Sequence, residues 1–297
     1  MARVGIVVTD SYPIEDPDVD TPRLLTALRE RGVGAEAVVW HDAAVAWSDF
    51  DVLVLRSPWD YPSRVAEFEA WFTEVAMLTR VLNEPALVHW NLDKRYLAAL
   101  AERGIGVVPT RYLEPGDGEV EEAGSALAEH GDGWVVVKPS VSAGAHDTAL
   151  VQAGSAEARD LVARILGRGA TAMLQPEVPE LSRGLEKALY LIDGEITHAI
   201  AKGALLERGG GFIGGAYQET PQIVAADDDE IAFARAVMAA VAAETGLDVP
   251  LYARIDTVRS AEHGLVLLEA EMFEPTFNLH LVPDVVETFA DAVLARL

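Results

Sequence analysis

Apolar residues fall in short unbroken runs and in helical stripes that alternate along the first part of the chain. The runs at 4–8, 35–40 and 51–57 predict buried strands, and the stripes at 21–32 and 62–78 predict amphipathic helices. Because strand and helix alternate, we expect a parallel, doubly wound sheet. In such a unit, ligands meet the loops that follow the strands.

A second block has shorter strands and a different rhythm. Its surface helix is followed by a glycine-rich exit, and one of its strands ends in a lysine and a proline. We therefore expect a small mixture of strands and helices that is distinct from the first unit. The helices are expected at 92–104, 119–133 and 155–169, and the strands at 134–140, 148–152 and 171–178.

The C-terminal block opens with alternating runs on both sides of Asp193-Gly194, which is a two-residue hairpin signal. A second hairpin is predicted from strands at 252–258 and 264–273. Helices are expected at 227–246 and 282–297. The whole pattern predicts an α/β chain of three units, which cover residues 1–90, 91–178 and 179–297.

Composition narrows the class of protein. The chain has 48 acidic against 23 basic residues, a net charge of −25, so its surface repels nucleic acids and anionic membranes. With no cysteines it cannot form disulfides, thiolate metal sites or cysteine nucleophiles. No apolar run approaches the ~20 residues of a membrane span, and the start lacks a signal-peptide pattern. We expect a cytoplasmic protein that binds anions only through local cations.

Two carboxylates interrupt the apolar strand predicted near the C-terminus. Glu269 and Glu271 are two residues apart, and alternate side chains share one face of a strand. Clustered carboxylates repel one another unless a cation lies between them, and a set of oxygen ligands suits Mg²⁺. In so acidic a chain, the alternative interpretation is a solvated strand face with acidic decoration.

The partner strand bears on this choice, because directly opposed residues share a face. If 259–264 forms the turn, Arg254 faces Glu269 and Asp256 faces Leu267. Both of these charged residues would then project the same way as the two glutamates. A slip of one residue in the register would destroy the grouping.

Two further features carry charge or exposed backbone at strand ends. Lys138 ends an apolar strand and precedes the small-residue loop 140–148, where backbone N–H groups could approach phosphate oxygens. The alternative is a surface lysine at a strand end. Near 175–177, a glutamine and a glutamate flank a proline that lacks an N–H group. This segment could read an adenine edge, or it could be an ordinary hinge between domains.

The loop 207–218 contains a formal GxGxxG pattern at Gly209, Gly211 and Gly214. No helix signal follows it, so a mobile lid or substrate loop is a better interpretation than a dinucleotide site. The histidines lack the spacing of a zinc site, and no GxSxG is present. Hydrolase chemistry therefore has no candidate nucleophile.

The order of these parts resembles the ATP-grasp superfamily, whose members fold as three α/β domains with ATP held between two of them. The resemblance covers essentially the whole chain. The segments RSPWDYP, HWNLDKRYL, VVPTRYLEPG, VVVKPSVSAGAH and YARIDTV…LVLLEAEMFEP are most similar to a small bacterial group that includes the O-ureido-serine cyclo-ligase. Glutathione synthetases and RimK-type ligases are more distant relatives.

The resemblance implies a role for each matching position. Arg254 would lie against the transferred phosphate, and the loop from Ser140 to His146 would cover the triphosphate. The ligands of Mg²⁺ would be Asp256, Glu269 and Glu271. The contacts to ATP would come from Lys94, Lys138, Ser142, Gly144, Gln175, Pro176, Glu177 and Val178.

The chain departs from the family pattern at two places. Many relatives have Glu-x-Asn where this chain has Glu269-Ala270-Glu271, and a third carboxylate is a competent ligand of Mg²⁺. Many close relatives also carry Phe-Arg where this chain has Phe212-Ile213. Lys202 or Arg208 would have to supply the missing positive charge.

The expected substrate contacts lie at the ends of strands. An arginine such as Arg56 would suit a substrate carboxylate, although a structural ion pair is the alternative for it. The other expected contacts are Asp10, Ser57, Glu274 and Asn278.

The chemistry implied is ATP-dependent amide formation through an acyl phosphate on a small amino-acid-like substrate, either between two molecules or by ring closure within one. The alternatives are a ligase that tags or joins peptides, a non-catalytic ATP-binding module, and a nicotinamide-dependent oxidoreductase that uses the 209–214 glycines. A homodimer is the default expectation for the assembly.

Overall fold

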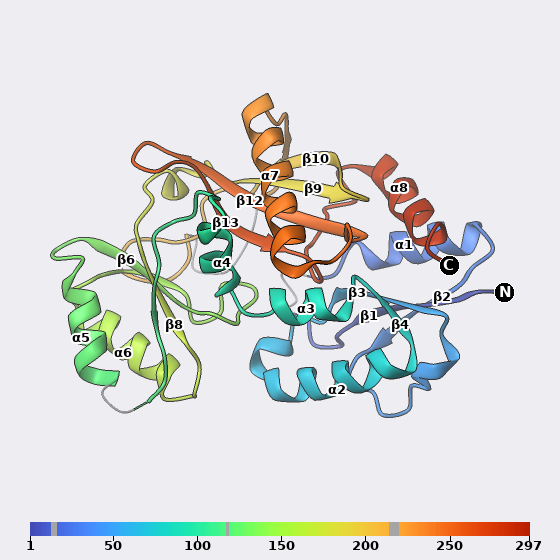
Figure 1. Ribbon diagram of the computed structural model, residues 1–297, viewed down its shortest axis with the longest axis horizontal. Coiled ribbons are helices and arrows are strands. Elements are labelled where there is room, and N and C mark those ends of the chain that lie inside the picture. The colour runs from blue at the N-terminus through green and yellow to red at the C-terminus, as the bar shows by residue number, and fades with distance from the viewer. Residues whose placement is uncertain (13–16, 117–118, 214–219) are drawn as a thin grey trace.

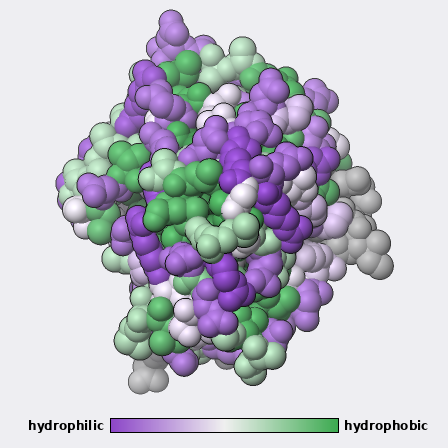
Figure 2. Space-filling model, turned by 90° about the vertical axis from the view of Figure 1, so that its right-hand side faces the viewer, coloured by the Kyte–Doolittle hydropathy of each residue, from purple (hydrophilic) through white to green (hydrophobic). Residues whose placement is uncertain are grey.

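The computed structural model describes residues 1–12, 17–116, 119–213 and 220–297, and these form three sheets (Figure 1). The first and last elements of the chain lie together, so both termini are at the same end of the molecule (Figure 1). Figure 2 views that end, where hydrophilic residues surround a group of hydrophobic ones. No helix in the described ranges is long and apolar enough to cross a membrane.

The first sheet is parallel, as the alternation of strands and helices predicts. Its strand order is β2-β1-β3-β4, and the three-residue strand β4 was not predicted. The central strands β1 and β3 are buried along nearly their whole length and are mostly apolar, because both of their faces are covered. The elements are β1 Arg3–Val8, α1 Thr21–Glu30, β2 Gly34–Val39, η1 Trp47–Asp49, β3 Val52–Ser57, η2 Tyr61–Ser63, α2 Val65–Leu78 and β4 Arg80–Leu82.

The second sheet is antiparallel and has the order β5-β8-β6-β7. Two helices pack on it and bury a separate apolar core. The second helix begins at Ser155, whose side chain accepts a hydrogen bond from the Ala158 N–H and caps the helix. The elements are β5 Arg111–Leu113, α5 Glu119–Ala128, β6 Trp134–Pro139, β7 Ala149–Gln152, α6 Ala156–Leu166 and β8 Ala172–Pro176.

The third sheet is antiparallel, with the order β11-β10-β9-β12-β13. Helix α7 covers one face of it, and α8 returns to pack beside α1 (Figure 1). Asp193-Gly194 forms the predicted hairpin between β9 and β10. The elements are η3 Leu181–Arg183, β9 Lys187–Ile192, β10 Glu195–Ala201, β11 Gln222–Val224, α7 Asp228–Thr245, β12 Tyr252–Ser260, β13 Gly264–Glu271 and α8 Pro283–Leu294.

The helix predicted over 92–104 is shorter in the structure, where α4 spans Tyr96–Glu102 and α3, Pro85–Asn91, precedes it. The N–H of Lys94 donates to the Ser140 carbonyl at 2.8 Å, so this residue belongs to the connection with the second sheet. Apolar residues of α3 and α4 share a core with the third sheet and α7. The connection between α3 and α4 is thus bonded at Lys94 to the end of the second sheet, while both helices pack on the third.

The register of β12 and β13 differs from the predicted one. The turn is shorter, so Val258 faces Val266, and a bulge follows on the way to the far end of the hairpin. Beyond the bulge, Asp256 faces Glu269 and Arg254 faces Glu271. The shorter turn alone would have put the charged residues on opposite faces, and the extra residue of the bulge restores them to one face.

Candidate functional site

Three carboxylates from β12 and β13 form the centre of the candidate site. One carboxylate oxygen from each of Asp256, Glu269 and Glu271 lies within 4.8 Å of the other two. Asp256 is buried and the two glutamates are half-buried. The grouping that the sequence predicts is therefore present, although a bulge rather than the predicted turn produces it. A donor set made only of carboxylate oxygens fits a hard cation such as Mg²⁺.

Three buried cations surround these carboxylates. Arg254 binds Asp256 in a two-pronged contact, with Nε–Oδ1 and Nη2–Oδ2 both at 2.8 Å. The same Nη2 lies 2.5 Å from Oε1 of Glu271. Lys202 Nζ is 3.2 Å from Asp256 Oδ2, and Lys94 Nζ is 2.9 Å from Glu269 Oε1. Each carboxylate of this partly buried cluster thus has a cation beside it.

Burial and these cations shift the pKa values of the three carboxylates in different directions. Burial works against ionisation of Asp256, yet Arg254 and Lys202 hold its pKa below the ordinary value. Burial opposes ionisation of Glu269 as well, but Lys94 and Lys138 keep its pKa low. For Glu271, burial wins against the attraction of Arg254 and raises the pKa to about 7. The site is an electrostatically tuned one, as functional sites commonly are.

Lys138 and the loop after it lie on the second sheet and face this cluster. Burial lowers the pKa of Lys138. The positive charge of Lys138 in turn helps to keep the pKa of Glu269 low. Lys94 Nζ also donates to the Ser142 carbonyl at 2.6 Å, so one lysine links the loop to the third sheet. Gly144 has a φ of +57°, in the left-handed region where glycine carries no steric penalty. The loop therefore exposes backbone close to two lysines.

The segment predicted to read adenine ends β8. The Gln175 side chain donates to Thr110 Oγ1 at 2.9 Å, and the Glu177 N–H donates to the Trp134 carbonyl at 3.0 Å. Pro176 ends the strand and Val178 is buried in a small apolar cluster. The Glu177 carboxylate forms a two-pronged ion pair with Arg208, at 2.8 and 2.7 Å.

That ion pair belongs to a set of contacts between the glycine-rich loop and the second sheet. The Arg208 guanidinium lies over the Trp134 ring at 5.3 Å. The N–H groups of Gly209 and Gly210 both donate to the Leu150 carbonyl, at 3.0 and 3.1 Å. Arg208 thus points to Glu177, whereas Lys202 contacts Asp256 of the carboxylate cluster, which favours Lys202 for the positive charge missing at Ile213. Gly214, the last glycine of the predicted GxGxxG pattern, lies outside the described residues, as does the rest of the loop up to 218.

We expect Arg208→Ala to weaken the docking of this loop. Its loss removes a two-pronged ion pair and a cation over an aromatic ring, and the effect is expected to be small because the pair is partly exposed. The expected result is several-fold faster amide hydrogen exchange at Gly209 and Gly210, with the melting temperature of the protein little changed. Hydrogen exchange followed by mass spectrometry checks this, and Arg183→Ala, a neighbouring exposed arginine, is the control. Unchanged exchange would show that the backbone bonds to Leu150 suffice.

The residues expected to contact substrate lie in different surroundings. Glu274 and Asn278 follow β13 and are buried beside the cluster, and Tyr61 donates to Glu274 Oε1 at 2.8 Å. Burial raises the pKa of Glu274 well above its ordinary value, and nearby Glu271 adds to the effect. Asp10 is exposed at the end of β1, where its carboxylate lies 3.3 Å from His41 Nε2.

Arg56 and Ser57 are almost fully buried and make contacts within the protein. Arg56 is 2% exposed, and its Nη2 donates to the Pro275 carbonyl at 2.6 Å. Ser57 is 1% exposed and its hydroxyl lies 2.5 Å from Asp18 Oδ2. Arg56 Nη2 also lies 3.6 Å from Asp20 Oδ2, and these contacts favour the alternative of a structural ion-pair partner.

The sequence analysis missed two polar residues of the site. Glu186 Oε1 lies 3.1 Å from Lys202 Nζ, directly before β9. Tyr190 faces Arg254 in the sheet, and its hydroxyl accepts a hydrogen bond from Asn278 Nδ2 at 3.2 Å. The alternation of β9 would have placed Tyr190 on the face of the cluster only once its register against β12 was known.

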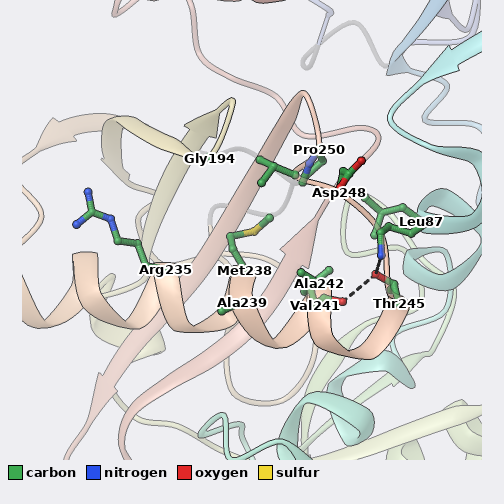
Figure 3. Close-up of a pocket in the computed structure, with 12 residues that line it drawn as sticks. Leu87, Gly194, Arg235, Met238, Ala239, Val241, Ala242, Thr245, Asp248 and Pro250 are labelled. Atoms are coloured by element: carbon green, nitrogen blue, oxygen red, sulfur yellow. Dashed lines mark hydrogen bonds between the residues drawn. The ribbon is translucent and has the colours of Figure 1, made fainter.

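A separate pocket of about 260 Å³ lies between α7 and the segment 247–250 (Figure 3). Its lining is mostly apolar and includes Met238 and Pro250. Ala253 and Ile255 point to the core beneath α7, and Arg254 and Asp256 alternate with them. The pocket is therefore on the opposite side of the sheet from the carboxylates.

Comparison with known proteins places this geometry in a class. The family of the D-cycloserine synthetase DcsG N-terminal domain matches residues 4–83. The cycloserine biosynthesis protein DcsG of Streptomyces lavendulae is 40% identical over 296 residues, which are 98% of this chain and 98% of that protein. The crystal structure of D-cycloserine synthetase DcsG has a TM-score of 0.91 at 38% identity, over 99% of both chains.

A more distant solved structure shows the same fold. It is that of the ATP-grasp ligase PsnB complexed with a phosphomimetic variant of its minimal precursor, Mg and ADP, with a TM-score of 0.60 at 15% identity. The match covers 99% of this chain and 98% of PsnB. These solved structures show that the protein has the fold of the ATP-grasp class. Within that class, the chain belongs to the DcsG family of D-cycloserine synthetases.

Proposed function

We propose that this protein closes the ring of a small serine-derived amino acid by ATP-dependent amide formation, as in the synthesis of D-cycloserine. The observation that carries the proposal is the 40% identity to DcsG along 98% of both chains. This similarity over the full length favours ring closure of a small molecule over the joining of peptides. The glycine pattern at 209–214 then needs no role in nicotinamide binding.

The proposed nucleotide site lies between the second and third sheets. Lys138, Lys94 and the loop 140–146 supply positive charge and backbone N–H groups for the triphosphate. The segment Gln175–Val178 would hold the adenine. Support for the placement comes from Lys94, which contacts both the loop and Glu269. The division into units 1–90, 91–178 and 179–297 agrees with three separate sheets and remains part of the proposal.

Asp256, Glu269 and Glu271 are the proposed ligands of Mg²⁺, which would neutralise charge on the β- and γ-phosphates. Arg254 and Lys202 lie directly beside these carboxylates. Their positive charges would meet the negative charge of the transferred phosphoryl group without any rearrangement of solvent. Glu274 and Asn278 would border the amino acid.

The proposed reaction has two steps. A substrate carboxylate oxygen attacks the γ-phosphorus of ATP, the bond to the β,γ-bridging oxygen breaks, and ADP leaves. The oxygen-bound nitrogen of the same substrate then attacks the acyl carbon, phosphate leaves with the bonding electrons, and the nitrogen loses its proton. When the substrate is O-ureido-D-serine, the ring nitrogen still carries its carbamoyl group after these two steps, and hydrolysis by one water molecule releases that group as carbon dioxide and ammonia to leave D-cycloserine. The protein's part is to position these groups, to balance charge and to keep water from the acyl phosphate.

An ADP-release assay with candidate substrates tests the proposal. We expect ADP formation with O-ureido-D-serine, little with the L-enantiomer, and a ring-closed product by mass spectrometry. Pairs of free amino acids and a short peptide serve as the comparison for intermolecular joining. ADP release only with such pairs, or NADH binding without any ATP turnover, would overturn the proposal.

A further inference from the structure

We propose that Asp20 and Arg56, which belong to the first unit, are positioning residues for the reaction, because together they hold the backbone of 275–279 at the substrate end of the site. The inference rests on the proposed function and adds to it two residues that are far from the carboxylate cluster in sequence. It assigns Arg56 a role through the backbone rather than through the substrate.

Asp20 binds two alternate N–H groups of this segment. Its Oδ2 accepts from the Phe277 N–H at 2.6 Å, and its Oδ1 accepts from the Leu279 N–H at 2.8 Å. The carboxylate is 2% exposed, so water does not compete for these bonds. Both oxygens of one carboxylate are therefore used to fix the residues on either side of Asn278.

Arg56 holds the beginning of the same segment. Its Nη2 donates to the Pro275 carbonyl at 2.6 Å and lies 3.6 Å from Asp20 Oδ2. The guanidinium also lies over the rings of Phe277 and Phe289, at 5.1 and 5.5 Å from their centroids. The positive charge of Arg56 thus offsets the buried negative charge of Asp20, and the same guanidinium binds the backbone of the segment.

His198 binds a backbone carbonyl that lies between the groups held by Arg56 and Asp20. Its Nε2 donates to the Phe277 carbonyl at 2.9 Å, and its ring stacks on Tyr190 with centroids 4.2 Å apart. Burial lowers the pKa of His198 to about 4, so the ring is neutral near pH 7. In its neutral form Nδ1 is left to accept from Thr197 Oγ1, at 2.9 Å. The segment is therefore held from the third sheet as well as from the first unit.

These contacts determine where Asn278 and Glu274 lie. Asn278 has a φ of +54°, a left-handed conformation that an asparagine tolerates but that packing must maintain. Its Nδ2 is thereby placed 3.2 Å from the Tyr190 hydroxyl, next to Arg254 in the sheet. Just before the segment, Trp59 Nε1 donates to the Glu274 carbonyl at 2.9 Å. The first unit thus sets the position of the residues that follow β13.

The variant that tests this is Asp20→Asn. An amide offers one acceptor oxygen, so one backbone N–H would face an NH₂ group and lose its partner. We expect kcat with O-ureido-D-serine to fall by about 10- to 100-fold, since a displacement of about 1 Å has effects of this size. The Kd for Mg-ADP should stay within about twofold, because the nucleotide contacts lie elsewhere. Amide hydrogen exchange at Phe277 and Leu279 should become faster.

The matched control is Asp227→Ala, which removes the side-chain cap of α7 and lies outside the contacts to 275–279. We expect it to lower the melting temperature and to leave kcat and the exchange of residues 275–279 unchanged. If Asp20→Asn does not fold, Arg56→Lys carries the test, because it keeps the charge beside Asp20 and shortens the reach to Pro275. It should lower kcat in the same way and by less.

Two outcomes would overturn the inference. One is faster exchange at Phe277 and Leu279 with an unchanged kcat, which would make the contacts purely structural. The other is unchanged exchange, which would show that Asp20 does not hold the segment. If the wild-type protein turns over no serine derivative, the proposed function fails. In that case, altered exchange beside an unchanged Kd for Mg-ADP would still confirm the hold on 275–279, and the positioning role in this reaction would fall with the function.

Discussion

Glu271→Gln should reduce Mg²⁺-dependent ADP formation by about two to three orders of magnitude and leave the protein folded. Glu271 completes a set of three carboxylates whose oxygens lie within 4.8 Å of one another. A neutral amide keeps one oxygen but loses the charge that attracts a divalent ion. Metal-assisted charge stabilisation is worth several kcal/mol in a transition state, and this is the origin of the expected size.

The fold should survive this change for a structural reason. Arg254 retains its two-pronged contact with Asp256, at 2.8 Å for each bond, so its charge is not left alone. Glutamine has nearly the shape of glutamate and can accept from Arg254. Thermal melting followed by circular dichroism should therefore shift by only a few degrees.

Glu262→Gln is the matched control, because Glu262 lies in the turn of the same hairpin with its side chain 81% exposed. ADP release is measured for both variants over a range of Mg²⁺ concentrations. We expect the control to behave as the wild type and Glu271→Gln to need more Mg²⁺ for its residual rate. An unchanged rate and an unchanged Mg²⁺ dependence would refute the role of Glu271 as a ligand.

The hairpin shows how far the sequence can predict such a site. The alternation of β13 is local, and it correctly places Glu269 and Glu271 on one face. The pairing with β12 depends on a turn and a bulge, and neither has a clear signal among the residues involved. Two errors of register, one at the turn and one at the bulge, cancel in their effect on which face Asp256 takes. The grouping was predicted correctly for a reason that was partly wrong.

Arg56 shows the opposite case. The sequence correctly predicts that Arg56 lies near the end of a parallel strand. In doubly wound sheets, such positions are typical of ligand contacts. Its actual partners, Pro275 and Phe277, come from more than 200 residues along the chain. Local pattern carries no information about such a contact. The same is true of Asp20, which sequence analysis did not select.

Arg254→Lys should lower the maximal rate of ADP formation by about 100-fold, with a smaller effect on stability. Lysine keeps the charge but has no planar fork, so it cannot hold both oxygens of Asp256 and reach Glu271 together. The charge in the buried cluster is preserved, and the cost of an unpaired carboxylate is avoided. Arg259→Lys is the matched control on the same strand, since that side chain is 50% exposed and pairs only with surface carboxylates.

The kinetic constants separate two ways in which Arg254 could act. A fall in kcat with an unchanged KM for ATP would mean that the guanidinium contacts the phosphoryl group only in the transition state. A fall that extra Mg²⁺ reverses would mean that its main task is to orient Asp256 and Glu271 as ligands. The geometry favours the first result for the larger part of the effect, because Lys202 also contacts Asp256, at 3.2 Å, and helps to hold it. Wild-type turnover by Arg254→Lys would contradict both, and it would leave Lys202 as the cation that meets the transferred phosphate.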